Sequence, residues 1–493
     1  MSPTPFRRFA FNLLWLLLAC SACAQDVPAP VPATITYAKF PNAAVDSTLD
    51  DYQVKSLTTR RFKQTDLQPL LQSLPAVLSV DTAGFSVEGR PLYRVEYGTG
   101  PVEVLLWSQM HGDEPTATAA LFDLFNWLAG EDMATDTLRR RIRTELHLTF
   151  LPMLNPDGAE VFERRNALGI DLNRDAVHLT SPEARVLKAE RDRLEAAWGF
   201  NLHDQGVYYS VGFPAEKGAV LSILAPAFDW EKTMSDKRED AAQLIALMND
   251  VWQAYVPGQV GRYNDDFEPR AFGDNLQKWG TRTVLIESGG YPGDPEKQEI
   301  RRLNVLALIA GLHGIASGRY ESFPLDDYFA IPENESNGMH ETILEDARVE
   351  LPAGTFTMDI GFRNAERTIG TAYRDYALTG FISDLGDLST FGARDRLDAS
   401  EYRIVPGKVY PGSHSVAAIA KLDAQKLYRQ GYTAVRLDRN PTQTSPVAGL
   451  RILAPNGRLA DRVGFSEPVD LLLYLETGQL IYAVVNGRLH QLD

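Results

Sequence analysis

The chain has 493 residues, which is too long for one ordinary domain, so we expect two or three domains. Its composition, 44% hydrophobic and 23% charged, is typical of a globular protein and excludes a fibrous or largely disordered chain. The formal net charge of -16 argues against a nucleic-acid-binding protein, because such proteins present a basic face and the sequence contains no basic patch.

Residues 1–24 are predicted to be a signal peptide. A basic start precedes an apolar run at 9–20, which is too short to span a bilayer and stay there. Two endings fit this segment. The small residues at 22–24 suit cleavage of a soluble secreted or periplasmic protein, whereas the sequence LLAC at 17–20 resembles a lipoprotein signal and would leave Cys20 as a lipidated first residue. No later segment has an apolar run long enough to span a membrane.

The chain has two cysteines, Cys20 and Cys23, and both lie in the signal segment. Cleavage after residue 24 would leave no thiol, which excludes a disulfide framework, a cysteine nucleophile and a thiolate metal site. Any metal ligands must then be His, Asp or Glu. The proline-rich residues 25–45 are predicted to form an extended tether.

Predicted strands and helices alternate between residues 46 and 325. The second of the helices opens with Ser181 as its N-cap and Pro182 at its first position. This alternation predicts an α/β domain with a mixed, mostly parallel central sheet flanked by helices. The strands are expected at 91–98, 102–107, 145–154, 200–205 and 282–288, and the helices at 115–129, 181–198 and 236–255.

Short alternating apolar and polar runs follow residue 325, for example at 347–362 and 402–412. Near the C-terminus, Asn486 and Gly487 form the signal for a tight hairpin turn. We therefore expect a second, smaller and mostly β domain over residues 326–493.

Candidate metal ligands and acids follow three of the predicted strands. His111 and Glu114 come after the second strand, His203 ends the fourth and Glu287 ends the fifth. The carboxyl ends of parallel strands meet at one edge of a sheet, where functional groups collect. A histidine and a glutamate three residues apart can face one point, and a second histidine completes a His₂Glu set of the kind that holds catalytic zinc. Taken alone, the first two residues are better explained as a polar strand end and a first-turn carboxylate that faces the helix dipole.

A second charged motif spans residues 155–175 and begins with a predicted turn, NPDG, at 155–158. Guanidinium groups bind carboxylates through two parallel hydrogen bonds, so a site that recognises a peptide C-terminus would use arginines in such a loop. By itself, the segment is also explained as a solvated, charged loop. Its polar residues of interest are Arg164, Arg165, Asp171, Asn173 and Arg174.

Taken in order, five motifs of the chain resemble those of the zinc metallocarboxypeptidases of the carboxypeptidase A type. They are HGDE, NPDG, RRNALGIDLNR, NLHDQ and LIESGG, and the resemblance covers roughly residues 46–320. It implies the zinc carboxypeptidase fold and hydrolysis of C-terminal peptide bonds by metal-activated water with a glutamate general base. It also implies one Zn²⁺ ion as cofactor and a peptide with a free C-terminus as substrate.

The resemblance also assigns roles around the metal. His111, Glu114 and His203 match the zinc ligands, and Glu287 matches the general base, which later returns the proton to the leaving amine. Asp171 matches the carboxylate that orients the first zinc histidine.

Further roles concern the substrate. Asn173 and Arg174 match the pair that binds the terminal carboxylate, and Arg164 matches the arginine that stabilises the oxyanion, with its neighbour Arg165 as the second choice. The family's substrate-capping tyrosine has no clean match in this chain. Tyr263 lies nearest in sequence, and a packed surface tyrosine is the other interpretation of it.

Two other functions stay open from the sequence. A zinc amidase could act on cell-wall peptides or acylated amino acids with the same scaffold. A catalytically inactive extracytoplasmic binding module could also keep the scaffold, but inactive relatives usually lose one member of the ligand and base set, and this chain lacks none.

Overall fold

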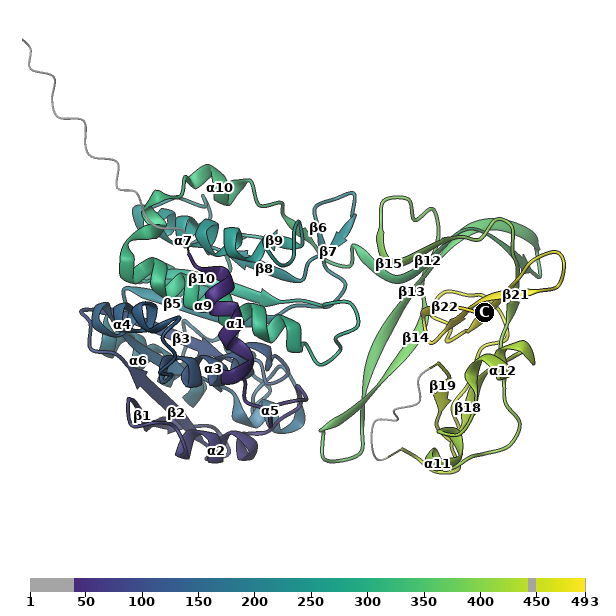
Figure 1. Cartoon of the computed structure of the whole chain (residues 1–493), viewed down its shortest axis with the longest axis horizontal. Helices are drawn as coiled ribbons and strands as arrows, with labels where there is room; N and C mark the ends of the chain where they lie inside the picture. Colours follow the sequence, from purple (N-terminus) through teal and green to yellow (C-terminus); the bar gives the residue numbers. More distant parts are fainter. Residues whose placement is uncertain (1–39, 442–448, 493) are drawn as a thin grey trace, which may run out of the picture. The chain divides into compact units, whose positions relative to one another are not determined.

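The central sheet of the α/β part has eight strands (Figure 1). The structure is a computed structural model, and it describes residues 40–441 and 449–492. Four neighbouring strand pairs are parallel and three are antiparallel, which confirms the predicted mixed, mostly parallel sheet. In sheet order the strands are β1 (Leu78–Phe85), β2 (Pro91–Tyr97), β4 (Leu146–Leu151), β3 (Val102–Ser108), β5 (Trp198–Asp204), β10 (Arg282–Ser288), β8 (Leu221–Leu224) and β9 (Val260–Arg262).

Strand β3 contributes to two hydrophobic cores because its side chains alternate between the faces of the sheet. Val104 and Leu106 belong to the larger core, and Leu105 and Trp107 belong to the smaller one. Helices supply the rest of both cores, so the sheet is covered on either face, as expected for parallel strands. The larger core includes α3 (Thr116–Leu128), α7 (Asp236–Trp252) and α9 (Gln298–Ser317), and the smaller one includes α6 (Pro182–Leu194) and α8 (Phe272–Lys278).

Two of the three predicted helices, α3 and α7, match their expected positions closely. Helix α6 begins as predicted, with the Ser181 hydroxyl accepting a hydrogen bond from the Ala184 amide at 3.3 Å. It ends at Leu194 rather than at residue 198, because Glu195 adopts a left-handed conformation (φ 48°) and Trp198 already starts β5. Helix α9 has no counterpart among the predicted elements.

Helix α1 (Asn42–Tyr52) starts inside the expected tether. Phe40, Val45 and Leu49 are buried in the larger core, and this burial orders the chain before residue 46. The predicted signal peptide, both cysteines and residues 25–39 lie outside the described residues. The remaining helices of the α/β part are α2 (Gln64–Gln72), α4 (Asp136–Glu145), α5 (Pro156–Val161), α10 (Leu325–Phe329) and the short 3₁₀ turns Leu172–Arg174 and Arg319–Ser322.

Strands dominate the chain after residue 338, and we call residues 339–492 the β part. One sheet has the order β14 (Asp375–Gly386), β13 (Gly354–Ile369), β12 (Met339–Leu351) and β15 (Gly392–Asp398). A second has the order β16 (Arg403–Pro406), β20 (Leu471–Tyr474), β21 (Leu480–Val485) and β22 (Arg488–Gln491). The predicted hairpin turn joins the last two, with positive φ angles of 53° at Asn486 and 78° at Gly487.

Short elements complete the chain. The strands are β17 (Lys408–Val409), β18 (Tyr432–Arg436) and β19 (Arg451–Leu453) in one sheet and β11 (Asn334–Glu335), β6 (Ser210–Val211) and β7 (Lys217–Gly218) in another. The helices are α11 (Val416–Ile419) and α12 (Ala424–Arg429). Among the described residues, no helix combines the length and the apolar composition needed to cross a membrane.

Polar contacts join the two parts of the described chain. Arg60 and Arg61, which lie before α2, both form ion pairs with Glu366 on β13. The Tyr376 hydroxyl donates to the Glu296 carboxylate at 2.6 Å. The β part therefore lies against the loops that precede α2 and α9.

Candidate functional site

The turn after β3 places the first two candidate ligands. Gly112 lies so close to the next loop that a Cβ there would fall 2.0 Å from the backbone carbon of Gly158, so the contact requires glycine. Gly158 belongs to the segment predicted as a turn, which forms the start of α5 with Asn155 as its N-cap. This close approach fixes the backbone between His111 and Glu114.

Strand register places His203 beside Glu287. The two residues are direct partners in the parallel pairing of β5 with β10. Partners in adjacent strands project to the same face of a sheet, so both side chains leave the sheet on one side. Both are almost completely buried.

The structure brings His111, Glu114 and His203 together. The Glu114 carboxylate lies 2.7 Å from Nδ1 of His111 through Oε1 and 2.7 Å from Nδ1 of His203 through Oε2. The two Nδ1 atoms are 3.2 Å apart, and the ligand atoms of the three residues all lie within 4.8 Å of one another. Each side chain is at least nine-tenths buried.

This arrangement fits a divalent cation. Two imidazole nitrogens and a carboxylate point their lone pairs at one another, and a positive ion between them would satisfy all three. The other ring nitrogen of His111, Nε2, lies 3.1 Å from Oδ1 of Asp171, the usual way in which a carboxylate fixes a ligand histidine's orientation.

Arg164 lies against this group of ligands. Its Nη1 is 3.0 Å from Nδ1 of His111 and 3.2 Å from Oε1 of Glu114, and its Nε donates to Oδ2 of Asp171 at 3.0 Å. Burial raises the pKa of Asp171, but the bonds to His111 and Arg164 outweigh it and lower that pKa overall. The Asp171 carboxylate is therefore held in its charged form.

Glu287 carries the opposite shift. Burial, followed by the charges of Glu114 and Asp204, raises its pKa well above the ordinary value, and Arg164 and Lys297 oppose that rise. A buried carboxyl beside a cation site, with a raised proton affinity, is suited to accept a proton and give it back.

The other predicted substrate-binding residues lie at the loop before α8. Arg174 forms an ion pair with Glu268, with 3.2 Å between Nε and Oε2, and the Asn173 side chain accepts the Phe272 amide at 2.8 Å. Arg165 instead donates to the Gly169 carbonyl at 2.9 Å, away from the ligand group. The structure thus brings Arg164, and not Arg165, to the candidate metal ligands.

Tyr263 lies close enough to Glu287 for the charge of that carboxylate to affect its pKa. Burial raises the pKa of Tyr263 first, and the charge of Glu287 and a bond to Tyr209 raise it further. Its ring stacks on that of Tyr209, with 6.1 Å between the ring centroids. Tyr263 is therefore near Glu287, at the edge of the sheet where the candidate ligands lie.

Lys297 belongs to the site, although the sequence gives no motif for it. Its Nζ lies 3.0 Å from Oδ2 of Asp204 and 3.0 Å from the carbonyl of Ser288, and Thr116 donates to the same Asp204 oxygen at 2.5 Å. These bonds join the ends of β5 and β10 to the start of α3. No sequence signal points to this role, because the contact between Lys297 and Asp204 forms only in the folded chain.

Comparison with known proteins agrees with this geometry. A family profile described as zinc carboxypeptidase matches residues 64–190. Over these residues, the chain is similar to the zinc carboxypeptidase family. The match includes His111, Glu114 and Arg164 but ends before His203 and Glu287, which the structure brings to the same place.

Several carboxypeptidases are similar to parts of the chain. Carboxypeptidase SOL1 of Arabidopsis thaliana is 38% identical over 98 residues, which are 19% of this chain and 20% of that protein. The catalytic chain of human carboxypeptidase N is 30% identical over 145 residues, or 25% of this chain and 32% of that protein. The chain therefore spans a third or less of these relatives' length. A metallo-carboxypeptidase structure from Burkholderia cenocepacia covers 50% of this chain and 67% of its own, with 19% identity and a TM-score of 0.40.

Proposed function

We propose that the protein is a zinc-dependent metallocarboxypeptidase that removes residues from the C-terminus of peptides. The observation that carries the proposal is the convergence of His111, Glu114 and His203 with Glu287 as the strand neighbour of His203. We further propose that one zinc ion is held by these three residues. When bound, zinc supplies Lewis acidity toward water and toward the scissile carbonyl.

The chain's own residues supply the remaining chemistry. Glu287 accepts a proton from the attacking water and delivers it to the departing amine, a role that its buried position and raised pKa favour. Arg164 donates to the oxygen that becomes negative in the tetrahedral transition state, since its guanidinium already lies at the ligand group. Asp171 holds both His111 and Arg164 in place.

Substrate recognition is assigned to the neighbouring loops. Asn173 and Arg174 bind the terminal carboxylate, which requires Arg174 to exchange its ion pair with Glu268 for one with the substrate. Tyr263 lies at the edge of the site and contacts the bound residue. We place these functions in a catalytic domain of residues 46–325, followed by a mostly β domain of residues 326–493.

The proposal is tested with matched peptides that differ in one group, a free or an amidated C-terminus. Mass spectrometry should show stepwise loss of single residues from the free peptide and little from the amidated one. Arg174→Ala should lower kcat/KM for the free peptide about a hundredfold, because about 2–3 kcal/mol of charge-assisted binding is lost. Cleavage of wall-derived peptides or acylated amino acids, without any loss of C-terminal residues, would overturn the carboxypeptidase proposal in favour of an amidase.

A further inference from the structure

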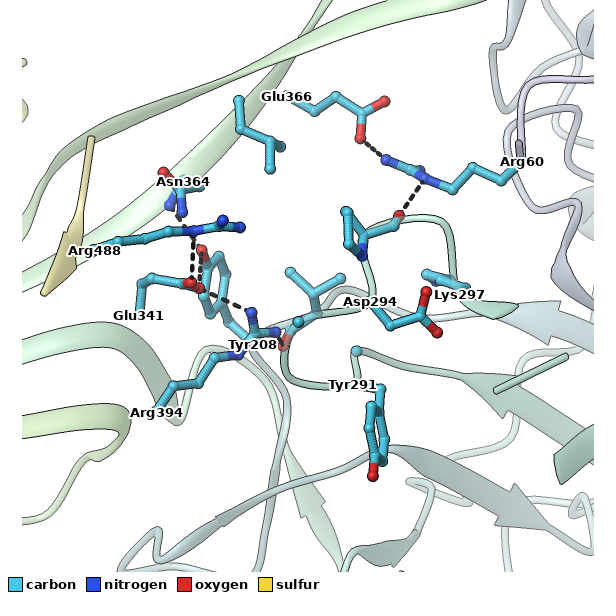
Figure 2. A pocket seen from close by; sticks show the side chains of 15 residues that line it. Arg60, Tyr208, Tyr291, Asp294, Lys297, Glu341, Asn364, Glu366, Arg394 and Arg488 are labelled. Carbon is cyan, nitrogen blue, oxygen red and sulfur yellow. Dashed lines mark hydrogen bonds and ion pairs between the residues drawn. The ribbon is translucent and has the colours of Figure 1, made fainter. Parts of the chain in front are cut away.

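A pocket lies where loops of the α/β part meet the β part. Figure 2 shows how its polar side chains lie. The α/β part contributes Arg60, Tyr208, Tyr291 and Lys297, among others, and the β part contributes Glu341, Arg394 and Arg488.

The pocket is close to the candidate catalytic residues along the chain. Val207 and Tyr208 follow His203 on the loop after β5, and Gly290 and Tyr291 follow Glu287 on the loop after β10. Both loops leave the same edge of the central sheet. A peptide whose C-terminal residue occupies the candidate site can therefore continue into the pocket.

Positive charge is in excess around Glu341, which lies on β12. Its carboxylate accepts a hydrogen bond from Nη1 of Arg394 at 2.9 Å, lies 3.3 Å from Nε of Arg488, and accepts the Tyr208 hydroxyl at 3.4 Å. One carboxylate thus pairs with two guanidinium groups. Within the described residues, the two terminal nitrogens of Arg488 have no hydrogen-bond partner, and Figure 2 shows its side chain extending across the pocket.

The other two acidic residues in the lining already have partners. Arg60 and Arg61 both bind Glu366. Asp294 accepts the backbone amide of Glu299 at 2.7 Å, at the start of the long helix α9, where the helix dipole favours a negative charge. Neither carboxylate is therefore a partner for the two terminal nitrogens of Arg488.

We propose that this pocket binds an acidic side chain of the peptide substrate, several residues upstream of the bond that is cut. Arg488 provides the binding edge, since a guanidinium with two free terminal nitrogens grips a carboxylate through parallel hydrogen bonds. The first pocket-lining residues of the two loops lie three to five positions beyond His203 or Glu287. An extended substrate, at about 3.3–3.6 Å per residue, needs a similar number of residues to reach them, so we place the acidic position about three to five residues before the cleaved bond. The inference rests on the proposed peptidase function and names a feature of its substrate.

Binding is measured separately from hydrolysis so that the two proposals can fail independently. The probe is a fluorescent hexapeptide that ends in a D-residue to resist cleavage, with Glu or Gln at the third, fourth or fifth position before the last bond. Anisotropy should show about three- to tenfold tighter binding of one Glu peptide than of its Gln counterpart at low ionic strength. Arg488→Glu should reverse this ratio and make a Lys peptide bind more tightly than either.

Arg458→Gln is the matched control, because Arg458 is also an exposed arginine of the β part that pairs with a glutamate, Glu467, but it does not line the pocket. Its Glu-to-Gln affinity ratio should equal that of the unmodified protein. Equal binding of Glu and Gln peptides at all three positions, or a ratio that Arg488→Glu leaves unchanged, would overturn the inference. If the unmodified protein shows the expected Glu-to-Gln affinity ratio but does not cleave peptides with an ordinary C-terminal residue, the peptidase proposal alone would be overturned.

Discussion

The carboxyl-end edge of the central sheet and the interior of the β part both bury charged side chains, but they balance the charge differently. In the β part, Asp470 and Arg451 pair one negative charge with one positive charge, with 2.9 and 2.7 Å between Oδ1 and two guanidinium nitrogens. At the sheet edge, three buried carboxylates crowd together on Glu114, Asp204 and Glu287, whereas the nearby cations are Arg164 and Lys297.

The difference distinguishes buried charges that stabilise the fold from buried charges that are available to a ligand. A buried ion pair with one charge of each sign needs no further ion, and this pair joins β19 to the residue before β20. A buried group with surplus negative charge is costly unless a cation joins it, and such crowding also raises the proton affinity of one member. The group at the sheet edge is therefore suited to a metal ion and a proton, whereas the balanced pair of Asp470 and Arg451 requires neither.

Glu287→Gln, which removes a carboxylate from the sheet edge, should have the largest effect. The amide keeps the shape of the carboxyl but cannot accept a proton, so we expect a loss of about a thousandfold or more in kcat. Metal content, measured by elemental analysis, should match the unmodified protein because Glu287 is not one of the three ligands. Turnover near the normal rate would show that another group is the base.

Arg451→Met tests the contribution of the buried ion pair in the β part to stability. It leaves Asp470, which is fully buried, without its cation, and breaking a buried pair in this way costs about 3–5 kcal/mol. Urea unfolding followed by a probe of the β part should show that loss. The double variant Arg451→Met with Asp470→Leu should recover most of it, and a failure to recover would mean that the cost lies in packing rather than in charge.

Removal of the proposed metal ion by a chelator should destabilise the protein, because the three ligands at the sheet edge lose the cation between them. A ligand present at a thousand times its Kd contributes about 4 kcal/mol to the native state, so its removal should lower Tm by several degrees. The drop is measured by calorimetry with and without chelator. In His203→Ala, which lacks one of the three ligands, the chelator should shift Tm much less, and an equal shift would place the stabilising metal elsewhere.

Much of the site could be predicted from the sequence because its residues follow strands. His111, His203 and Glu287 come at the ends of apolar runs, and parallel strand ends meet at one edge, so their convergence follows from local pattern and general topology. Lys297 could not be predicted in this way. It reaches Asp204 across 93 positions of sequence from a left-handed residue before α9, a contact that only the folded chain creates.

The helices and strands likewise differ in how far the sequence predicts them. Strands β3 and β10 are apolar runs bounded by polar residues, and they were predictable to within one residue. Helix α9 is buried on nearly all sides, so its sequence lacks the one-sided apolar pattern by which surface helices are recognised. The pocket with Arg488 was also beyond prediction, because its walls come from two parts of the chain that no local motif connects.

A pH titration tests a buried histidine whose hydrogen-bond partner is a hydroxyl group rather than a carboxylate. His340 on β12 is fully buried, with Nδ1 2.9 Å from the Ser383 hydroxyl, and burial, followed by the charge of Arg363, lowers its pKa to about 4. The unfolded chain binds this proton near pH 6.5 and the folded chain only near pH 4, so unfolding takes up a proton in between and stability falls as pH drops through that window. From pH 7 to 4.5 this residue should lower the free energy of unfolding by about 2–3 kcal/mol.

Urea unfolding at the two pH values should show this contribution absent in His340→Gln and still present in His178→Gln, which changes an exposed histidine. Equal pH dependence in both variants would mean that other groups control acid stability.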